Sequence, residues 1–190
     1  MSHANARDDT DDLALLQRMA AGDRAALATL YRAYHGRICR FLSRLTRRPD
    51  VIEEVVNDCF WIAWQRAADF RGDARVSTWL MGIAYRCGLK ALRQRGDEQM
   101  DEAFLPMHDG GEDPGDDREL RDLLAKAMAL LSVDQRVVVE LVYGVGYSLG
   151  EVAAITQCPV GTVKARLFHA RVKLLNVVPV LGGDTGTAGA

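Results

Sequence analysis

Residues 148–175 read SLGEVAAITQCPVGTVKARLFHARVKLL, and the interpretation of the whole chain starts from this stretch. Its hydrophobic spacing predicts a short helix over residues 149–156 and a longer helix over residues 160–176. Gln-Cys-Pro at 157–159 separates the two. Pro159 suits the first position of the second helix, because its missing N–H has no helical partner there. The stretch therefore predicts a helix, a tight turn and a second helix.

The second of these helices is basic on its outward face, and no acidic residue occurs from 161 to 175. Its inner face consists of Val163, Leu167, Ala170 and Leu174. A helix of this size fits the major groove of DNA, where its N-terminal part contacts base edges. Thr162, Lys164 and Arg166 are placed for bases or phosphates. The alternative is a solvated helix whose basic residues interact with the helix dipole. The turn and the capping pattern favour the DNA-binding interpretation.

The rest of the second half is also helical by its pattern. Ser132 with Gln135, and Ser148 with Glu151, have the spacing of capping boxes, which satisfy the first free N–H groups of a helix. A regular hydrophobic stripe precedes them, made of Leu120, Leu123, Leu124, Ala127, Leu130 and Leu131. At least one further helix is therefore predicted before the helix–turn–helix.

The first half repeats the three-and-four spacing of amphipathic helices. A first helix around residues 27–45 is followed by one that Asp50 caps, over residues 50–67, and by one that Ser77 caps, over residues 77–95. No segment alternates in the way that a half-buried strand would. The predicted fold class is all-α.

Composition and charge exclude several classes of protein. The chain has 190 residues, 48% of them hydrophobic and 26% charged, which suits one ordinary domain or two small ones. No run approaches the roughly 18 apolar residues of a membrane helix. The first twelve residues contain four Asp and one Arg, which is the wrong charge for a signal peptide. We therefore expect a cytoplasmic protein with no membrane insertion.

The positions of the Cys and His residues predict no metal site and no catalytic site. The four Cys, at 39, 59, 87 and 158, form no CxxC pair, and the four His, at 3, 35, 108 and 169, form no HxxxH pair. These spacings predict no metal site, and nothing predicts another cofactor. No nucleophile–base set is evident, so no catalytic residue is predicted and the chain is not expected to be an enzyme.

An acidic joint divides the chain. Residues 97–117 carry nine Asp or Glu and no Lys or Arg, so they cannot bury enough apolar area to offset their ordering entropy. The predicted organisation is a disordered acidic tail (1–12), a first domain (13–96), a flexible acidic linker (97–117), a second domain (118–178) and a flexible tail (179–190). The linker either is a plain spacer or imitates nucleic acid and screens the basic faces of the free protein.

Four stretches together resemble one family. GEVAAITQCPVGTVKARLFHARVKLL resembles the −35-reading region of bacterial sigma factors of the extracytoplasmic-function (ECF) type, in group 4 of the sigma-70 family. AAGDRAALATLYRAYHGRICRFL is similar to its opening helix, VIEEVVNDCFWIAW to its polymerase-binding helix, and STWLMGIAYRCGLKALRQR to its −10-reading helix. The resemblance covers about residues 13–178 in the family's order. It implies two small helical domains, sigma-2-like and sigma-4-like.

The resemblance implies a transcription initiation factor. Such a factor binds core RNA polymerase and directs it to promoter DNA, reading the −35 element as duplex and the −10 element as melted strand. An anti-sigma factor is the implied inhibitory partner. The implied polymerase-binding residues are Glu54, Asn57, Asp58 and Trp61, with Asn57 where the family more often has Gln. For Trp61 the alternative is that it packs on a neighbouring helix.

The same resemblance implies two sets of DNA-binding residues. The −10 set is Phe70, Trp79, Tyr85, Arg86, Lys90, Arg93 and Arg95. The −35 set is Thr162, Lys164, Arg166, Phe168, His169 and Arg171. Trp79 is either a core residue or a stacking platform. Arg86 stands where the family commonly has Asn, which favours a phosphate contact there. His169 stands where the family often has Arg, and a His is only partly charged near neutral pH.

One other class of protein fits the helix–turn–helix. A conventional transcriptional regulator would form a stable dimer and bind duplex DNA tightly by itself, because such proteins usually read paired half-sites. The sequence offers no evident dimerisation helix, and the acidic linker suits that class poorly.

Overall fold

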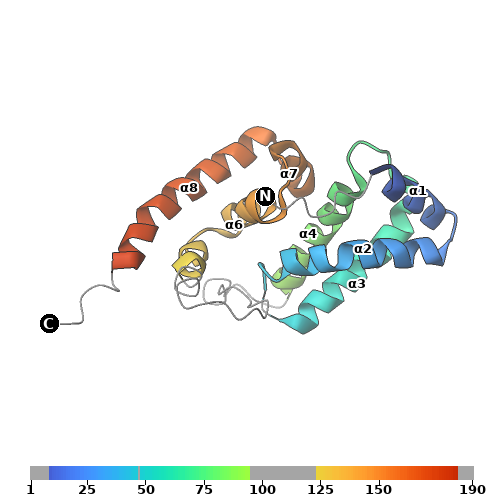
Figure 1. Ribbon diagram of the computed structural model, residues 1–190, viewed down its shortest axis with the longest axis horizontal. Helices are drawn as coiled ribbons and strands as arrows, with labels where there is room; N and C mark the ends of the chain where they lie inside the picture. Colours follow the sequence, from blue (N-terminus) through green and yellow to red (C-terminus); the bar gives the residue numbers. More distant parts are fainter. Residues whose placement is uncertain (1–8, 47, 95–122, 184–190) are drawn as a thin grey trace.

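The computed structural model describes residues 9–46, 48–94 and 123–183, and these residues contain helices and no β-strand (Figure 1). This confirms the predicted all-α class. The first half consists of α1 (Asp9–Ala20), α2 (Arg24–Leu42), α3 (Pro49–Arg66), the 3-10 helix η1 (Ala67–Asp69) and α4 (Val76–Gln94). In the second half, a helical segment over 123–129 precedes α6 (Val133–Val139), the π-helix η2 (Glu140–Val145), α7 (Leu149–Thr156) and α8 (Val160–Gly183).

Local sequence signals set several of these boundaries. The Ser132 and Ser148 capping boxes are both present at the starts of α6 and α7, as predicted. Asp23 caps α2 by accepting hydrogen bonds from the N–H groups of Ala25 and Ala26, at 2.8 and 3.3 Å. Gln157 ends α7 in the left-handed conformation, with φ of 55°, and this residue makes the turn into α8.

Three boundary predictions at helix starts are wrong. Pro49 occupies the start of α3, so Arg48 is the N-cap and Asp50 lies inside the helix. A proline is preferred at that position, because its φ fits the helix and it has no N–H to satisfy. Val76 starts α4, which places Ser77 inside rather than at the cap. Pro159 precedes α8 and its carbonyl accepts the first helical bonds, from Thr162 and Val163.

The predicted tails are also too long where the structure describes them. Residues 9–12 belong to α1, and Asp12 is buried and accepts a hydrogen bond from the Tyr34 hydroxyl. A specific partner on α2 thus orders residues that their acidity assigned to a disordered tail. Residues 179–183 continue α8, which places Pro179 inside the helix. Residues 1–8, the linker at 97–117 and the tail at 184–190 lie outside the described residues.

The two halves share one hydrophobic core. The continuous set of buried side chains runs from Leu15 in α1 to Ala170 in α8. Within the first half α3 packs on α4, and α1 and α2 pack on each other; within the second half α6 and α7 both pack on α8. Figure 1 shows α7 lying between α8 and α4. The junction of the halves is therefore the packing of α7 on α4.

Candidate nucleic-acid and protein interfaces

The outer face of α3 carries an exposed aromatic ring among acidic and amide groups. Glu54, Asn57, Asp58 and Trp61 are all exposed, and Trp61 is 61% exposed. The opposite face is buried and holds Val51, Ile52, Val55, Val56, Cys59, Phe60 and Ala63. The structure thus brings the four predicted residues together on one surface, which we call the α3 face. The alternative in which Trp61 packs on a neighbouring helix is wrong.

The predicted −10 residues divide into an exposed basic group and a covered aromatic group. Arg86, Lys90 and Arg93 are exposed along α4. Tyr85, one residue away, is buried.

Two more aromatic side chains of the −10 set contact each other. The rings of Phe70 and Trp79 meet edge to face, with centroids 5.3 Å apart, and both residues are half-buried against the core. Trp79 is therefore partly a core residue. Arg95 lies outside the described residues.

The predicted −35 residues lie on α8, and two of them contact other side chains of the same chain. Lys164, Phe168 and His169 are exposed, and Thr162 is half-buried. Arg166 turns back from the exposed face to form an ion pair with Asp134 at the start of α6, with 2.5 Å between nitrogen and oxygen.

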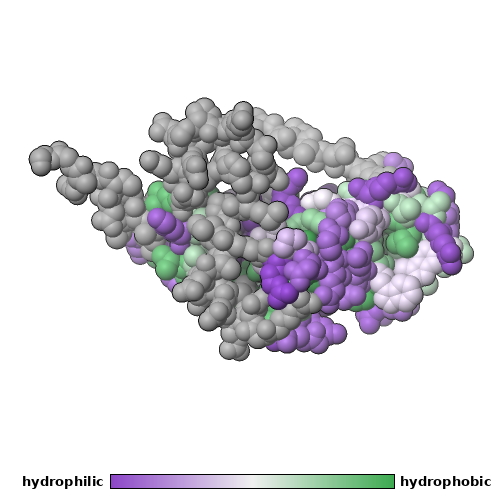
Figure 2. Space-filling view, turned by 90° about the horizontal axis from the view of Figure 1, so that it is seen from below, coloured by the Kyte–Doolittle hydropathy of each residue, from purple (hydrophilic) through white to green (hydrophobic). Residues whose placement is uncertain are grey.

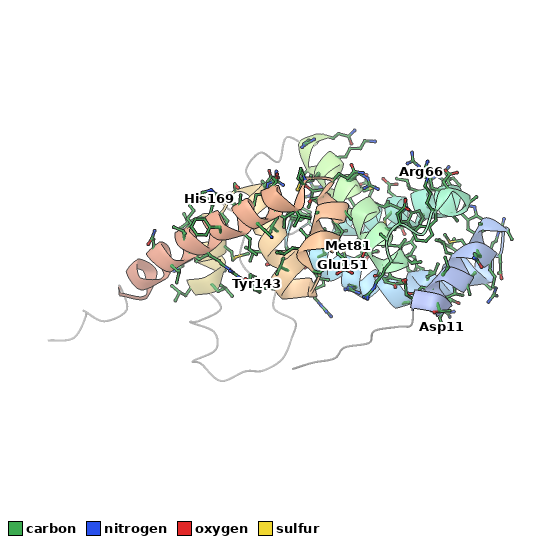
Figure 3. The ribbon with its side chains drawn as sticks, turned by 90° about the horizontal axis from the view of Figure 1, so that it is seen from above. Asp11, Arg66, Met81, Tyr143, Glu151 and His169 are labelled. Atoms are coloured by element: carbon green, nitrogen blue, oxygen red, sulfur yellow. The ribbon has the colours of Figure 1, made fainter. Side chains whose placement is uncertain are left out.

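The last residue of that set, Arg171, also has a partner within the chain. Its guanidinium lies 5.5 Å from the centre of the Tyr143 ring and donates a hydrogen bond to the Tyr143 hydroxyl. Figure 3 shows Tyr143 and His169 at the α8 end of the molecule. Arg166 and Arg171 are therefore held by Asp134 and Tyr143 in this conformation.

Tyr147 joins the halves from the loop before α7. Its hydroxyl donates a hydrogen bond to the carbonyl of Ser77 on α4, at 3.2 Å. The Arg37 guanidinium of α2 lies 4.7 Å from the centre of its ring. Burial raises the pKa of Tyr147 to about 12, so the hydroxyl remains a donor at neutral pH. One tyrosine of the second half thus contacts two helices of the first half.

Glu151 of α7 supplies the polar contacts at the same junction. It accepts a hydrogen bond from the Thr78 hydroxyl at 3.4 Å and lies 4.0 Å from Arg75. Burial alone would raise the pKa of Glu151, but hydrogen bonds from the backbone N–H and hydroxyl of Ser148 hold it below its usual value. The carboxylate therefore both caps α7 and contacts α4.

Gly82 allows α7 to approach α4 closely. A Cβ atom at Gly82 would lie 3.3 Å from Nη1 of Arg86 on the same helix, and in contact with Ile155 of α7, 3.7 Å from its Cα and 3.8 Å from its carbonyl oxygen. Tyr85, one turn further, is buried, and its hydroxyl is close enough to Asp134 and Arg166 to feel their charges. Burial, followed by the charge of Asp134, raises the pKa of Tyr85. The helix–turn–helix thus covers part of the predicted −10 surface.

The contacts between the two halves are not predictable from local sequence patterns. The capping box at Ser148 identified Glu151, but only as a local cap. Nothing in the local pattern pairs Asp134 with Arg166, which are 32 residues apart, or Tyr147 with Ser77, which are 70 apart. In the sequence, Gly82 lies on the same helix face as Arg86 and Lys90, at spacings of four. A glycine on a helix face among larger residues is a signal of close backbone approach.

Where Figure 2 shows described residues, most of the visible side chains are hydrophilic, with smaller hydrophobic groups among them. In the part of the chain that the structure describes, none of the helices combines the length and the hydropathy that a membrane crossing requires. Among the described residues, the predicted recognition residues that are exposed lie on the α3 face and on the basic faces of α4 and α8.

Comparison with known families assigns both halves. The family described as sigma-70 region 2 matches residues 30–98, and the family described as sigma-70, region 4 matches residues 121–174. The first match contains α3 and α4, and the second contains α6 to the middle of α8. The two matches fall on the two halves that the linker was predicted to separate.

Relatives of known function match over nearly the whole chain. The ECF RNA polymerase sigma-E factor of Haemophilus influenzae is 30% identical over 185 residues, which are 90% of this chain and 96% of that protein. The ECF RNA polymerase sigma-E factor of Escherichia coli (strain K12) is 31% identical over 183 residues, which are 90% of this chain and 95% of that protein.

Solved structures support the fold. RpoE of Bartonella quintana, in complex with the anti-sigma factor NepR, matches with a TM-score of 0.64 at 27% identity, over 80% of this chain and 96% of that one. CnrH, in complex with the cytosolic domain of CnrY, matches with a TM-score of 0.67 at 22% identity, over 89% of this chain and 97% of that one. The chain therefore belongs to the sigma-70 family, to its ECF type, and is a non-enzymatic initiation factor that directs RNA polymerase to promoters.

Proposed function

We propose that the chain binds core RNA polymerase through the α3 face, reads the −35 element with α8 and captures the melted −10 strand with the loop before α4 and α4 itself. The observation that carries this proposal is Trp61, which is 61% exposed on α3, one turn after Asn57 and Asp58. Folding gains little from a large aromatic ring left in water, whereas interfaces favour such residues as anchors. Residues 13–96 would bind the polymerase and the −10 strand, and residues 118–178 would read the −35 element.

The basic faces of α4 and α8 support the DNA-binding part of the proposal. Arg86, Lys90 and Arg93 follow one side of α4, as backbone tracking along a single strand requires. On α8, Lys164 and His169 are exposed beside Phe168, and an apolar ring of this kind contacts thymine methyl groups in the major groove. Transcription initiation by this protein would take place in the cytoplasm, where RNA polymerase binds DNA.

The free protein would be a closed form with weak DNA binding. In this conformation Tyr85 is buried under the second half and Arg166 is paired with Asp134, so neither set of DNA-binding residues is fully available. Polymerase binding would separate the halves and expose both. The acidic linker over 97–117 would add to the masking by competing with DNA for the basic faces.

An anti-sigma factor would stabilise the inactive form. The solved relatives RpoE and CnrH were each obtained in complex with a second protein, NepR and the cytosolic domain of CnrY respectively. We extend this kind of partner to the present chain, with the α3 face as the surface to be covered.

Run-off transcription tests the proposed function. The purified protein would be mixed with bacterial core RNA polymerase and a genomic promoter library, and the 5′ ends of the transcripts sequenced. Discrete start sites that share −35 and −10 elements and need both components are expected. A conventional regulator would instead fail to bind core polymerase and would bind duplex DNA tightly as a dimer.

A leucine at Gly82 tests the closed form. The carbons beyond Cβ would meet the backbone of Ile155, and overpacking of this kind costs roughly 1–3 kcal/mol. We expect Gly82→Leu to open the junction, increase the radius of gyration and raise affinity for single-stranded −10 DNA about 5- to 150-fold. The matched control is Gly36→Leu on α2, where a Cβ meets nothing within 4 Å. Equal compactness and DNA affinity in both variants would contradict the closed form.

The Arg166–Asp134 pair predicts opposite effects of two substitutions on −35 binding. Arg166→Ala removes a base or phosphate contact and should lower affinity for promoter duplex about 5- to 150-fold. Asp134→Asn releases Arg166 from a partly exposed ion pair and should raise affinity about 1.5- to 5-fold. Fluorescence anisotropy at one fixed salt concentration measures both.

Asp11→Asn, an equal change of charge at an exposed site on α1, is the control for the second effect. Asp134→Asn binding no tighter than this control would show that Arg166 is not held back from DNA.

A further inference from the structure

A mixed cluster of metal-ligating side chains lies on the seam between α2 and α3. It consists of His35 and Cys39 on α2 and Glu53 on α3, and one ligand atom from each residue lies within 4.8 Å of the other two. None of these residues belongs to the polymerase-binding or DNA-binding sets. We propose that this cluster binds one Zn²⁺ ion.

The distances already approach those of a metal centre. The Cys39 sulfur lies 3.6 Å from Nε2 of His35, and the same nitrogen lies 3.7 Å from Oε1 of Glu53. Zinc–ligand bonds of about 2.0–2.3 Å in tetrahedral geometry place the donor atoms about 3.3–3.5 Å apart. Shifts of a few tenths of an ångström in these side chains therefore suffice to complete the His35–Cys39 and His35–Glu53 edges of the site.

Sequence position and packing bring the three donors together. His35 and Cys39 are four residues apart, so they lie one above the other on the same side of α2. The ring of His35 contacts the ring of Tyr31, with centroids 5.0 Å apart, and Tyr31 in turn contacts Phe60 of α3 at 4.8 Å. These contacts limit the rotation of the His35 ring and keep it at the seam.

The donor set favours zinc over the common hard cations. A thiolate and an imidazole suit borderline-soft ions such as Zn²⁺, whereas Ca²⁺ and Mg²⁺ require oxygen donors. Three protein ligands leave one tetrahedral position open for water or for a donor from another molecule. The side chains of His35 and Glu53 are 33% and 57% exposed, so an ion can reach the site from solvent. The bound ion would tie α2 to the first turns of α3.

The sequence predicts no metal site, because it contains neither a CxxC pair nor an HxxxH pair. His35 and Cys39 form a mixed pair at the helical spacing of four, which neither a CxxC nor an HxxxH pattern contains. The third donor comes from another helix, so only the packing of α3 on α2 reveals it.

Cobalt and zinc binding to the reduced full-length protein test the proposal. Co²⁺ at this site should give a thiolate-to-cobalt charge-transfer band with one ion per chain, and Zn²⁺ should displace it. We expect Cys39→Ser to abolish the band and His35→Gln to weaken zinc binding by more than the roughly 10- to 100-fold that loss of an outer-shell partner costs. Glu53→Gln should weaken it less, because a carboxamide oxygen still reaches the ion.

Cys87→Ser is the matched control, since Cys87 is a half-buried thiol of α4 outside the cluster, and it should retain the band. Circular dichroism and melting in chelator would establish that each variant folds without metal. The proposal is overturned if the wild type shows no band, or if Cys39→Ser binds zinc as tightly as Cys87→Ser does.

Discussion

Arg136→Met is expected to lower the free energy of unfolding by about 3–5 kcal/mol. Arg136 is 1% exposed, and its guanidinium donates to the carbonyl oxygens of Met128, Ala129 and Leu131, each at 3.2 Å. Met128 and Ala129 end the helical segment over 123–129 and Leu131 follows it, so these carbonyls lack the usual i+4 N–H partners of a helix interior. The Met128 carbonyl also accepts a backbone hydrogen bond from the N–H of Leu131, at 3.1 Å. Methionine fills similar volume but removes the donors of the Ala129 and Leu131 carbonyls and one of the two donors of the Met128 carbonyl, and each unsatisfied acceptor costs about 1–3 kcal/mol.

Urea and thermal unfolding followed by circular dichroism would measure this effect. For a chain of this size the midpoint temperature should fall by roughly 6–20 °C. Lys126→Met is the matched control, because Lys126 is exposed on the same helical segment and its loss should change stability by less than about 0.5 kcal/mol. If the two variants are equally stable, Arg136 does not hold the segment in place.

Trp61→Ala is expected to weaken binding to core RNA polymerase by roughly 30- to 900-fold while leaving the fold intact. An aromatic anchor at the centre of an interface contributes about 2–4 kcal/mol, and Trp61 is the large exposed aromatic side chain of the α3 face. Because 61% of Trp61 is exposed in the free protein, removing it should change the free energy of unfolding by less than about 0.5 kcal/mol. Biolayer interferometry against immobilised core polymerase would give the affinities.

Phe168→Ala provides a control with the opposite pattern. Phe168 is 63% exposed, about as much as Trp61, but it lies on α8 in the predicted −35 set. This variant should lose affinity for promoter duplex and keep its affinity for core polymerase, whereas Trp61→Ala should do the reverse. Equal losses of polymerase binding in both variants would show that the α3 face is not the main contact.

Predictions from the sequence succeeded where the signal is local. The Ser132 and Ser148 capping boxes are present because a cap depends on residues within one turn. The hydrophobic stripe of α3 is buried because the helical period alone decides which side chains share a face. The position of Trp61 off that stripe, and hence its exposure, follows from the same period.

Predictions were wrong where they rested on composition and a specific tertiary contact decided the structure instead. Asp12 was assigned to a disordered tail because its neighbours are acidic, yet Tyr34, 22 residues later, donates to its carboxylate in the core. The pKa of Tyr34 is raised, first by burial and then by this hydrogen bond, so the hydroxyl remains a donor. The burial of Arg136 was likewise not predictable, because nothing in its local sequence distinguishes a buried, carbonyl-bound arginine from a solvated one.

The all-α class, the helix–turn–helix, the basic face of α8 and the family resemblance can all be predicted from the sequence. These follow from periodicity and caps, which act over a few residues, and from motifs in a fixed order. Only the tertiary structure decided that Glu151 contacts Thr78, 73 residues away, that Arg166 is paired with Asp134, and that Glu53 joins His35 and Cys39. Such contacts depend on how whole helices dock, and docking is set by the complete shape of both faces rather than by the spacing within either one.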